Sequence, residues 1–163
     1  MRRYLYLMRH AEAALGAGSS GDFARVLTAR GIDQATATAR WIVAQPHPPE
    51  YALVSAAQRT QQTFEVLSRT LAIARRDMSS ALYDAELSTC LSLVQTLPTD
   101  CSVALILAHN PGMQELLNVL VTGRVGEARF GMGTASCVRL SADLTWEHWA
   151  PGVAECEAHW PED

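Results

Sequence analysis

The sequence contains no lysine, and all 13 of its basic residues are arginines. This absence excludes a P-loop, whose lysine contacts nucleotide phosphates, and it excludes catalysis through a lysine Schiff base. The 17 acidic residues give a net charge of −4, so we do not expect nucleic acid as a partner.

The sequence has few cysteines, and none of them lies in a Cys-x-x-Cys pair. None is followed six residues later by arginine, which excludes the loop of cysteine-based phosphatases. Apolar runs of membrane length and a signal peptide are also absent, so we expect a cytoplasmic protein without membrane contact or disulfides. The four cysteines, interpreted mainly as buried thiols, are Cys90, Cys101, Cys137 and Cys156.

What the sequence does have fits a folded globular protein. Its hydrophobic content is 48%, and 163 residues suffice for one domain with a sizeable core. Strand-type and helix-type patterns alternate without internal repeats. This alternation predicts an α/β fold in a single domain spanning residues 1–163.

A short apolar run near the N-terminus ends in Arg9 and His10. Residues 4–8 are all apolar or aromatic and predict a buried strand. Ligands of open α/β sheets bind beyond the carboxyl ends of the strands, where this strand would place both side chains. Arginine offers a charged fork suited to phosphate, and histidine is a nucleophile or base that titrates near neutral pH. Arg9 and His10 indicate a functional site only if later segments bring matching polar groups to the same edge of the sheet.

Residues 11–25 are rich in Ala, Gly and Ser, which predicts a loop. Within it, residues 16–21 fit the G-x-G-x-x-G spacing of dinucleotide sites. The stretch does not directly follow the strand, and no helix opens at Gly21, so we interpret it as a loop. Thr28 then fits the N-cap of a helix that runs to about Ala44.

A second strand is predicted over Tyr51–Ser55, with a helix from about Ala57. Arg59 therefore lies in the first turn of this helix, where a cation is unfavourable against the helix dipole. An anion bound jointly by Arg59 and the helix start would remove the conflict. A solvated surface arginine is an equally open alternative from this segment alone.

A third strand is predicted over residues 78–83, followed by a helix over residues 87–97. Glu86 lies at the start of that helix. The helix dipole favours a carboxylate there whatever its other role. The position of Glu86 can therefore be explained by the helix alone, whether or not Glu86 also has a function.

The most apolar run, Ser102–Ala108, predicts a central strand covered on both faces. It ends at His109, which repeats the placement of His10. Pro111 suits the first position of the next helix, which should stop at Gly123. Two further strands are predicted over residues 135–140 and 144–150, and we interpret His148 and His159 as structural or exposed.

The complete pattern resembles the histidine phosphatase superfamily over nearly the whole chain. Arg9-His10 matches the N-terminal motif of the family, the segment around Arg59 matches its second arginine, and His109-Asn110-Pro111 matches its second histidine. The resemblance implies a histidine phosphatase domain with a phosphoglycerate mutase-like, three-layer α/β/α sandwich and a mainly parallel sheet. Ala11 departs from the usual glycine, which affects local backbone freedom only. The loop that follows lacks the polar residues of sugar-phosphate mutases, which argues against a mutase.

Short length and the His-Asn-Pro segment are most similar to the small SixA-type phosphohistidine phosphatases of this family. The resemblance implies that His10 forms a phosphohistidine intermediate while Arg9, Arg59 and His109 bind the phosphoryl oxygens. Glu86 resembles the acid of relatives that cleave esters. No cofactor and no metal are expected.

The expected partner is a protein bearing phosphohistidine, such as a phosphotransfer domain. Two alternatives remain open. The first is a general phosphomonoesterase acting on small phosphorylated metabolites. The second, weaker one is a phosphate-binding adaptor without turnover, which would have little need for His10; an assay of released phosphate separates it from an enzyme.

Overall fold

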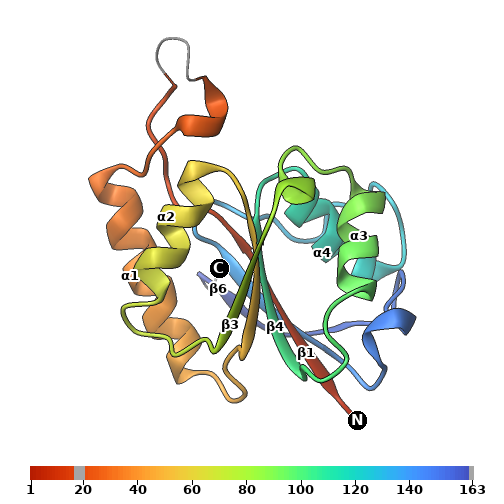
Figure 1. Cartoon of the computed structure of the whole chain (residues 1–163). Helices are drawn as coiled ribbons and strands as arrows, with labels where there is room; N and C mark the ends of the chain where they lie inside the picture. Colours follow the sequence, from red (N-terminus) through yellow and green to blue (C-terminus); the bar gives the residue numbers. More distant parts are fainter. Residues whose placement is uncertain (17–20, 162–163) are drawn as a thin grey trace.

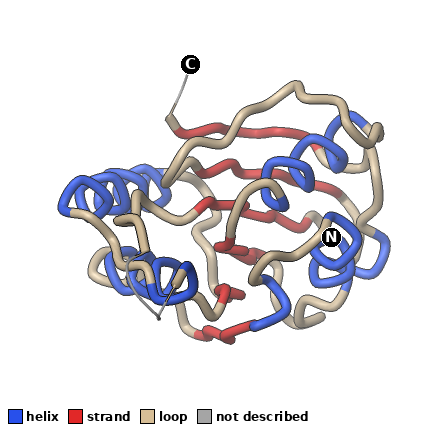
Figure 2. The backbone as a smooth tube through the Cα atoms, turned by 90° about the horizontal axis from the view of Figure 1, so that it is seen from above, coloured by secondary structure: helices blue, strands red, loops and turns tan. Residues whose placement is uncertain are grey.

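A computed structural model describes residues 1–16 and 21–161 of the chain, and within them it shows a central sheet with helices on both faces (Figures 1 and 2). The sheet has six strands in the order β3-β2-β4-β1-β5-β6. They are β1 (Arg3–Arg9), β2 (Tyr51–Ser55), β3 (Arg75–Ser79), β4 (Val103–Ala108), β5 (Cys137–Ala142) and β6 (Glu155–Trp160).

The sheet is mainly parallel, as predicted. Strands β1, β2, β3 and β4 pair in parallel, so their carboxyl ends meet at one edge. Strand β5 pairs antiparallel with β1 and with β6. The site therefore has to be sought where β1, β2 and β4 end.

The alternation of side chains along β1 divides the core into two layers. Leu5 and Leu7 point into a cluster with the helices α3 (Leu87–Gln95) and α4 (Gly112–Thr122). Tyr6 and Met8 point to the opposite face, against α1 (Ala29–Ala44) and α2 (Gln58–Leu67). A strand covered on both faces reads as a continuous apolar run, which is why the sequence located β1 and β4 well.

Two helix ends were recognisable from single residues. The Thr28 hydroxyl accepts a hydrogen bond from the Gly31 amide at 3.0 Å and caps α1. Gly123 follows α4 with a φ of 76°, the left-handed conformation that glycine adopts readily. Both of these predictions are confirmed.

The third strand was predicted too late in the chain. Residues 75–79 form β3, and Ser80–Leu82 form the short 3₁₀ helix η3. Strand β3 is polar and largely exposed at the edge of the sheet, so it carries no apolar alternation. The buried, apolar Leu82 lies in η3, and it is the reason why the strand was predicted over residues 78–83.

The strand predicted over residues 144–150 is wrong. Residues 146–148 form the 3₁₀ helix η4, and the last strand is β6, some ten residues later. Trp146 and Trp149 are both buried against the α3–α4 side, which their three-residue spacing allows. The Trp146 indole nitrogen donates to the Cys101 carbonyl at 2.9 Å.

Two short elements lie in the described part of the loop after β1. Ala13 and Leu27 form an isolated antiparallel bridge, and Asp22–Ala24 form the short 3₁₀ helix η2. The glycine-rich stretch 16–21 lies mostly outside the described residues. Among the helices of residues 1–16 and 21–161, none is long and apolar enough to cross a membrane.

Candidate active site

The two histidines identified from strand ends lie side by side. Strands β1 and β4 are neighbours with Arg9 opposite Ala108, and the His10 amide donates to the Ala108 carbonyl at 3.0 Å. The ring centroids of His10 and His109 are 5.3 Å apart. Adjacent parallel strands thus convert two distant sequence positions into one site.

A polar cavity of about 460 Å³ surrounds these rings. The structure brings Arg9, His10, Arg59 and His109 together in its lining. Asn110, part of the His109-Asn110-Pro111 segment, also lines it. The remaining lining residues, which the sequence analysis did not single out, are Glu12, Ala13, Asp22, Arg25, Tyr83, Asp84 and Thr134.

The protonation pattern of His10 follows from its surroundings. Its Nδ1 lies 2.7 Å from the Ala11 carbonyl oxygen, and a carbonyl can only accept a hydrogen bond. Nδ1 therefore carries the proton, and Nε2 keeps its lone pair. The Arg59 Nε–H donates to this Nε2 at 3.3 Å. The nucleophilic atom of the neutral imidazole thus faces a guanidinium group.

Burial and positive charge keep both imidazoles neutral. Desolvation is the main cause that lowers the pKa of His10 to about 4, with Arg59, Arg9 and Arg25 adding to it. Desolvation and Arg59 likewise lower the pKa of His109 to about 3. Near neutral pH the cavity therefore holds positive charge on its arginines and none on its two histidines.

Arg59 is held by the η2 segment. Its guanidinium donates to the Asp22 carbonyl at 2.8 Å and to the Asp22 carboxylate at 3.1 Å. The Tyr83 hydroxyl donates to the same carboxylate at 2.6 Å, and Arg25 pairs with it at 3.1 Å. These donors hold the pKa of Asp22 well below its usual range, the Tyr83 hydrogen bond contributing most. Arg59 is thus buried and oriented rather than solvated.

Two buried nitrogen atoms at the site have no hydrogen-bond partner within residues 1–16 and 21–161: Arg9 Nε and His109 Nδ1. The other ring nitrogen of His109, Nε2, lies 2.7 Å from the Ser55 hydroxyl. If the hydroxyl donates to Nε2, Nδ1 carries the proton. Buried polar groups are rarely left unpaired, so these two point to an anionic ligand with several acceptor oxygens.

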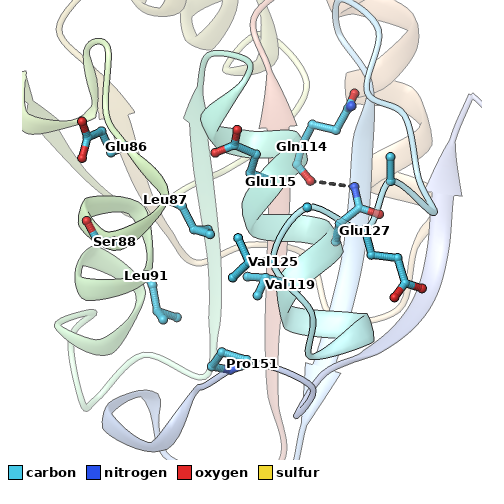
Figure 3. A pocket seen from close by; sticks show the side chains of 13 residues that line it. Glu86, Leu87, Ser88, Leu91, Gln114, Glu115, Val119, Val125, Glu127 and Pro151 are labelled. Atoms are coloured by element: carbon cyan, nitrogen blue, oxygen red, sulfur yellow. Dashed lines mark hydrogen bonds between the residues drawn. The ribbon is translucent and has the colours of Figure 1, made fainter.

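Glu86 does not line the cavity around His10. It is exposed at the N-cap of α3 without a side-chain capping bond, beside Leu87 (Figure 3). It lines an adjacent hollow of about 260 Å³ that also contacts Asp84, His109 and Asn110. Its assignment as an acid stays a prediction, and three other carboxylates, those of Glu12, Asp22 and Asp84, lie in the cavity itself.

The residues that the sequence analysis missed come from loops. Asp22 and Arg25 enter the site from the segment after β1, and Tyr83 and Asp84 from the turn after η3. Only Glu12 and Asn110 could have been proposed from the sequence, because each lies within two residues of a histidine that the sequence analysis had identified. Within the described residues, no group of three His, Cys, Asp or Glu side chains could hold a metal ion.

Comparisons with known proteins agree with this geometry. The sequence profile of the histidine phosphatase superfamily (branch 1) matches residues 5–86. A search of curated proteins gave no significant match.

Three similar solved structures carry the name SixA. One, named as a phosphohistidine phosphatase from Nakamurella multipartitia, is 26% identical, with a TM-score of 0.83 over 98% of this chain and 95% of the other. One from Agrobacterium tumefaciens is 24% identical, with a TM-score of 0.81 over 98% and 99%. A protein histidine phosphatase SixA complexed with tungstate is 26% identical, with a TM-score of 0.79 over 96% and 95%.

The profile covers half of the chain, including Arg9, His10 and Arg59, and the structural match extends through His109 to the C-terminal strand. The chain belongs to the histidine phosphatase superfamily, branch 1, and is a phosphatase.

Proposed function

We propose that this chain hydrolyses phosphohistidine on another protein, with His10 as the nucleophile. The observation that carries the proposal is the tautomer of His10. The Ala11 carbonyl holds the proton on Nδ1, so the Nε2 lone pair points into a cavity lined by arginines. The similarity to proteins named SixA supports phosphohistidine as the substrate, and one of these proteins is bound to tungstate, a tetrahedral oxyanion like phosphate.

The reaction has two displacements at phosphorus. In the first, the Nε2 lone pair of His10 bonds to phosphorus as the bond to the substrate imidazole breaks, and the leaving nitrogen takes a proton from the solvent. In the second, water attacks phosphorus and releases a proton to the solvent, the bond between phosphorus and His10 Nε2 breaks, and phosphate leaves while His10 returns to its neutral form. Arg9, Arg59 and the Nδ1–H of His109 would bind the non-bridging oxygens, where charge must be neutralised.

The leaving group favours phosphohistidine over an ester. Imidazole leaves easily because its conjugate acid has a pKa of about 6.5, whereas an alkoxide needs a strong general acid. Each carboxylate of Glu12 and Asp22 is already engaged, with Arg30 and with Arg25 and Arg59 respectively. The cavity is also open and polar, which suits a phosphorylated side chain on a protein surface.

A general phosphomonoesterase is the second candidate. It is favoured by Asp84, which lines the cavity and makes no hydrogen bond or ion pair within residues 1–16 and 21–161. The Asp84 carboxyl group would be the proton donor that an ester leaving group needs. A wild-type enzyme that prefers a sugar phosphate over phosphohistidine would support this candidate.

Rapid-quench trapping with a ³²P-labelled phosphohistidine protein tests the nucleophile. We expect label on His10 in a form that acid destroys and base preserves, because a phosphoramidate is acid-labile. His10→Asn should trap no label and should lose at least about a thousandfold in rate, as expected for removal of a nucleophile. The asparagine amide can still donate to the Ala11 carbonyl, so the fold should survive.

Circular dichroism of His10→Asn provides the folding control for this experiment. Label on a serine or cysteine, or full activity in the folded variant, would contradict the assignment of His10.

A further inference from the structure

A second cavity, larger than the one around His10, is lined in part by Glu86 and by the first residues of α3. It has a volume of about 710 Å³ and runs between α3, α4 and the loop after α4 (Figure 3). Its apolar lining includes Leu87 and Leu91 from α3, Val119 from α4, and Val125 and Pro151 from loops. We call this cavity the α3–α4 groove.

Each helix that forms the groove presents a row of side chains along one of its faces. Leu87 and Leu91 are four residues apart on α3, and Glu115 and Val119 are four residues apart on α4, so each pair lies on one side of its helix. Val125 is 78% exposed above them. Amphipathic helices bind proteins by placing their apolar face in such a groove.

The rim of the groove is acidic. Among the residues that the structure describes, its charged lining residues are Glu86, Glu115 and Glu127, and no arginine lines it. Within residues 1–16 and 21–161, Glu86 and Glu115 form no ion pair, and Glu127 pairs only with the exposed Arg124 at 3.8 Å. This surface therefore favours a partner with an apolar face and basic residues beside it.

The groove is continuous with the active site. Glu86 and Glu115 line both the α3–α4 groove and the small hollow beside it. That hollow in turn shares Asp84, His109 and Asn110 with the cavity around His10. A protein whose phosphorylated side chain enters the arginine-rich cavity would thus extend over the acidic rim and into the groove.

We propose that the α3–α4 groove binds an amphipathic helix of the phosphohistidine-bearing substrate protein, with basic residues of that helix facing Glu86 and Glu115. This inference rests on the proposed function, since it names how the same substrate is recognised. The active site supplies the contacts to the phosphoryl group, and the groove supplies affinity for the protein that carries it.

Two synthetic phosphohistidine peptides of identical composition test the groove. One arranges its leucines on one helical face with two arginines near the phosphohistidine, and the other is scrambled. We expect wild-type kcat/KM to be about tenfold higher for the amphipathic peptide, a difference typical of one well-packed anchor. Val125→Asp should reduce this ratio to about one while hydrolysis of phosphoimidazole stays within about twofold of wild type.

Val43→Asp is the matched control, because Val43 is also exposed but lies on α1, on the opposite face of the sheet. It should keep the tenfold ratio. Glu115→Arg should lower kcat/KM for the arginine-bearing peptide and leave phosphoimidazole hydrolysis unchanged. Equal rates on both peptides in the wild type, or a ratio that Val125→Asp leaves intact, would overturn the proposal.

A binding measurement separates failure of this proposal from failure of the proposed function. If the wild type hydrolyses neither phosphoimidazole nor the peptides, the proposed function fails. Fluorescence anisotropy with the unphosphorylated amphipathic peptide then still reports on the groove. Binding that Val125→Asp abolishes supports the groove. No binding, or a dimer of this chain that Val125→Asp dissociates, overturns it.

Discussion

At the scale of single residues, the tautomer of His10 depends on one backbone carbonyl. The Ala11 carbonyl at 2.7 Å selects the proton on Nδ1, and Arg59 donates a hydrogen bond at 3.3 Å to the unprotonated Nε2. The sequence predicted the histidine and the arginine but not this contact, because a backbone carbonyl has no signature in the sequence. Asp22 and Tyr83, which orient Arg59, were missed for a similar reason: they reach the site from loops that only the folded chain brings together.

We predict that His10 stays neutral, with its proton on Nδ1, down to about pH 4. Burial and three arginines lower its pKa to about 4, so acid must reach that value before Nε2 is protonated and loses its nucleophilic lone pair. Nitrogen-15 NMR of histidine-labelled protein measures both properties, and His10→Asn assigns the signal. A midpoint near 6.5, or a proton on Nε2, would disagree with the structure.

The acid for ester cleavage is tested by a pair of variants, Glu86→Gln and Asp84→Asn. We predict that Glu86→Gln leaves phosphohistidine hydrolysis within about twofold and lowers phenyl phosphate hydrolysis at least about tenfold, because only the ester needs a proton donor. Rates on both substrates in both variants measure this. A loss on phenyl phosphate in Asp84→Asn alone would assign the acid to Asp84, the carboxylate inside the cavity.

At the scale of elements, buried strands and capped helices were predictable and polar edges were not. Strand β4 is apolar throughout because it lies between β1 and β2 under helices on both faces. The edge strands β3 and β6 are polar. The sequence analysis placed β3 too late in the chain and predicted no strand at β6. The site nevertheless was predictable, because its histidines follow β1 and β4, the strands that the sequence marks most clearly.

The packing of α1 on the segment after His10 gives a prediction at this scale. A Cβ at Gly31 would overlap the backbone carbonyl oxygen of Glu12, two residues beyond His10. Gly31→Ala should therefore lower the free energy of unfolding by about 1–3 kcal/mol, the usual cost of overpacking, and should also reduce activity. Urea denaturation measures the first effect.

Gly133→Ala is the control for Gly31→Ala, since a Cβ at Gly133 meets no atom of residues 1–16 and 21–161 within 4 Å. An unchanged midpoint in Gly31→Ala would show that the Glu12 backbone can move away at little cost.

At the scale of the whole molecule, building the site costs stability in acid. His10 and His109 are both buried, at 6% and 7% exposure, between arginines that the fold fixes in place. Unfolding restores their ordinary pKa, so the unfolded chain binds protons that the folded chain refuses. The same electrostatics that keep the nucleophile neutral thus oppose folding at low pH.

We therefore predict that stability falls as the pH is lowered from 6.5 to 4. In this window the unfolded His10 is protonated and the folded one is not, which favours the unfolded state by up to about 3 kcal/mol at pH 4. The salt-bridged Asp22, whose pKa is depressed in the folded chain, begins to lose its contribution as the pH falls through the ordinary pKa of an aspartate, about 3.9, so most of that loss lies below this window. Urea denaturation of the wild type and of His10→Asn at pH 7.5 and at pH 4.5 measures the effect. His10→Asn should lose clearly less stability between the two pH values, because one proton-binding difference is gone. Equal losses in both proteins would mean that His10 is protonated as readily in the folded chain as in the unfolded one, which would also remove the argument for a neutral nucleophile.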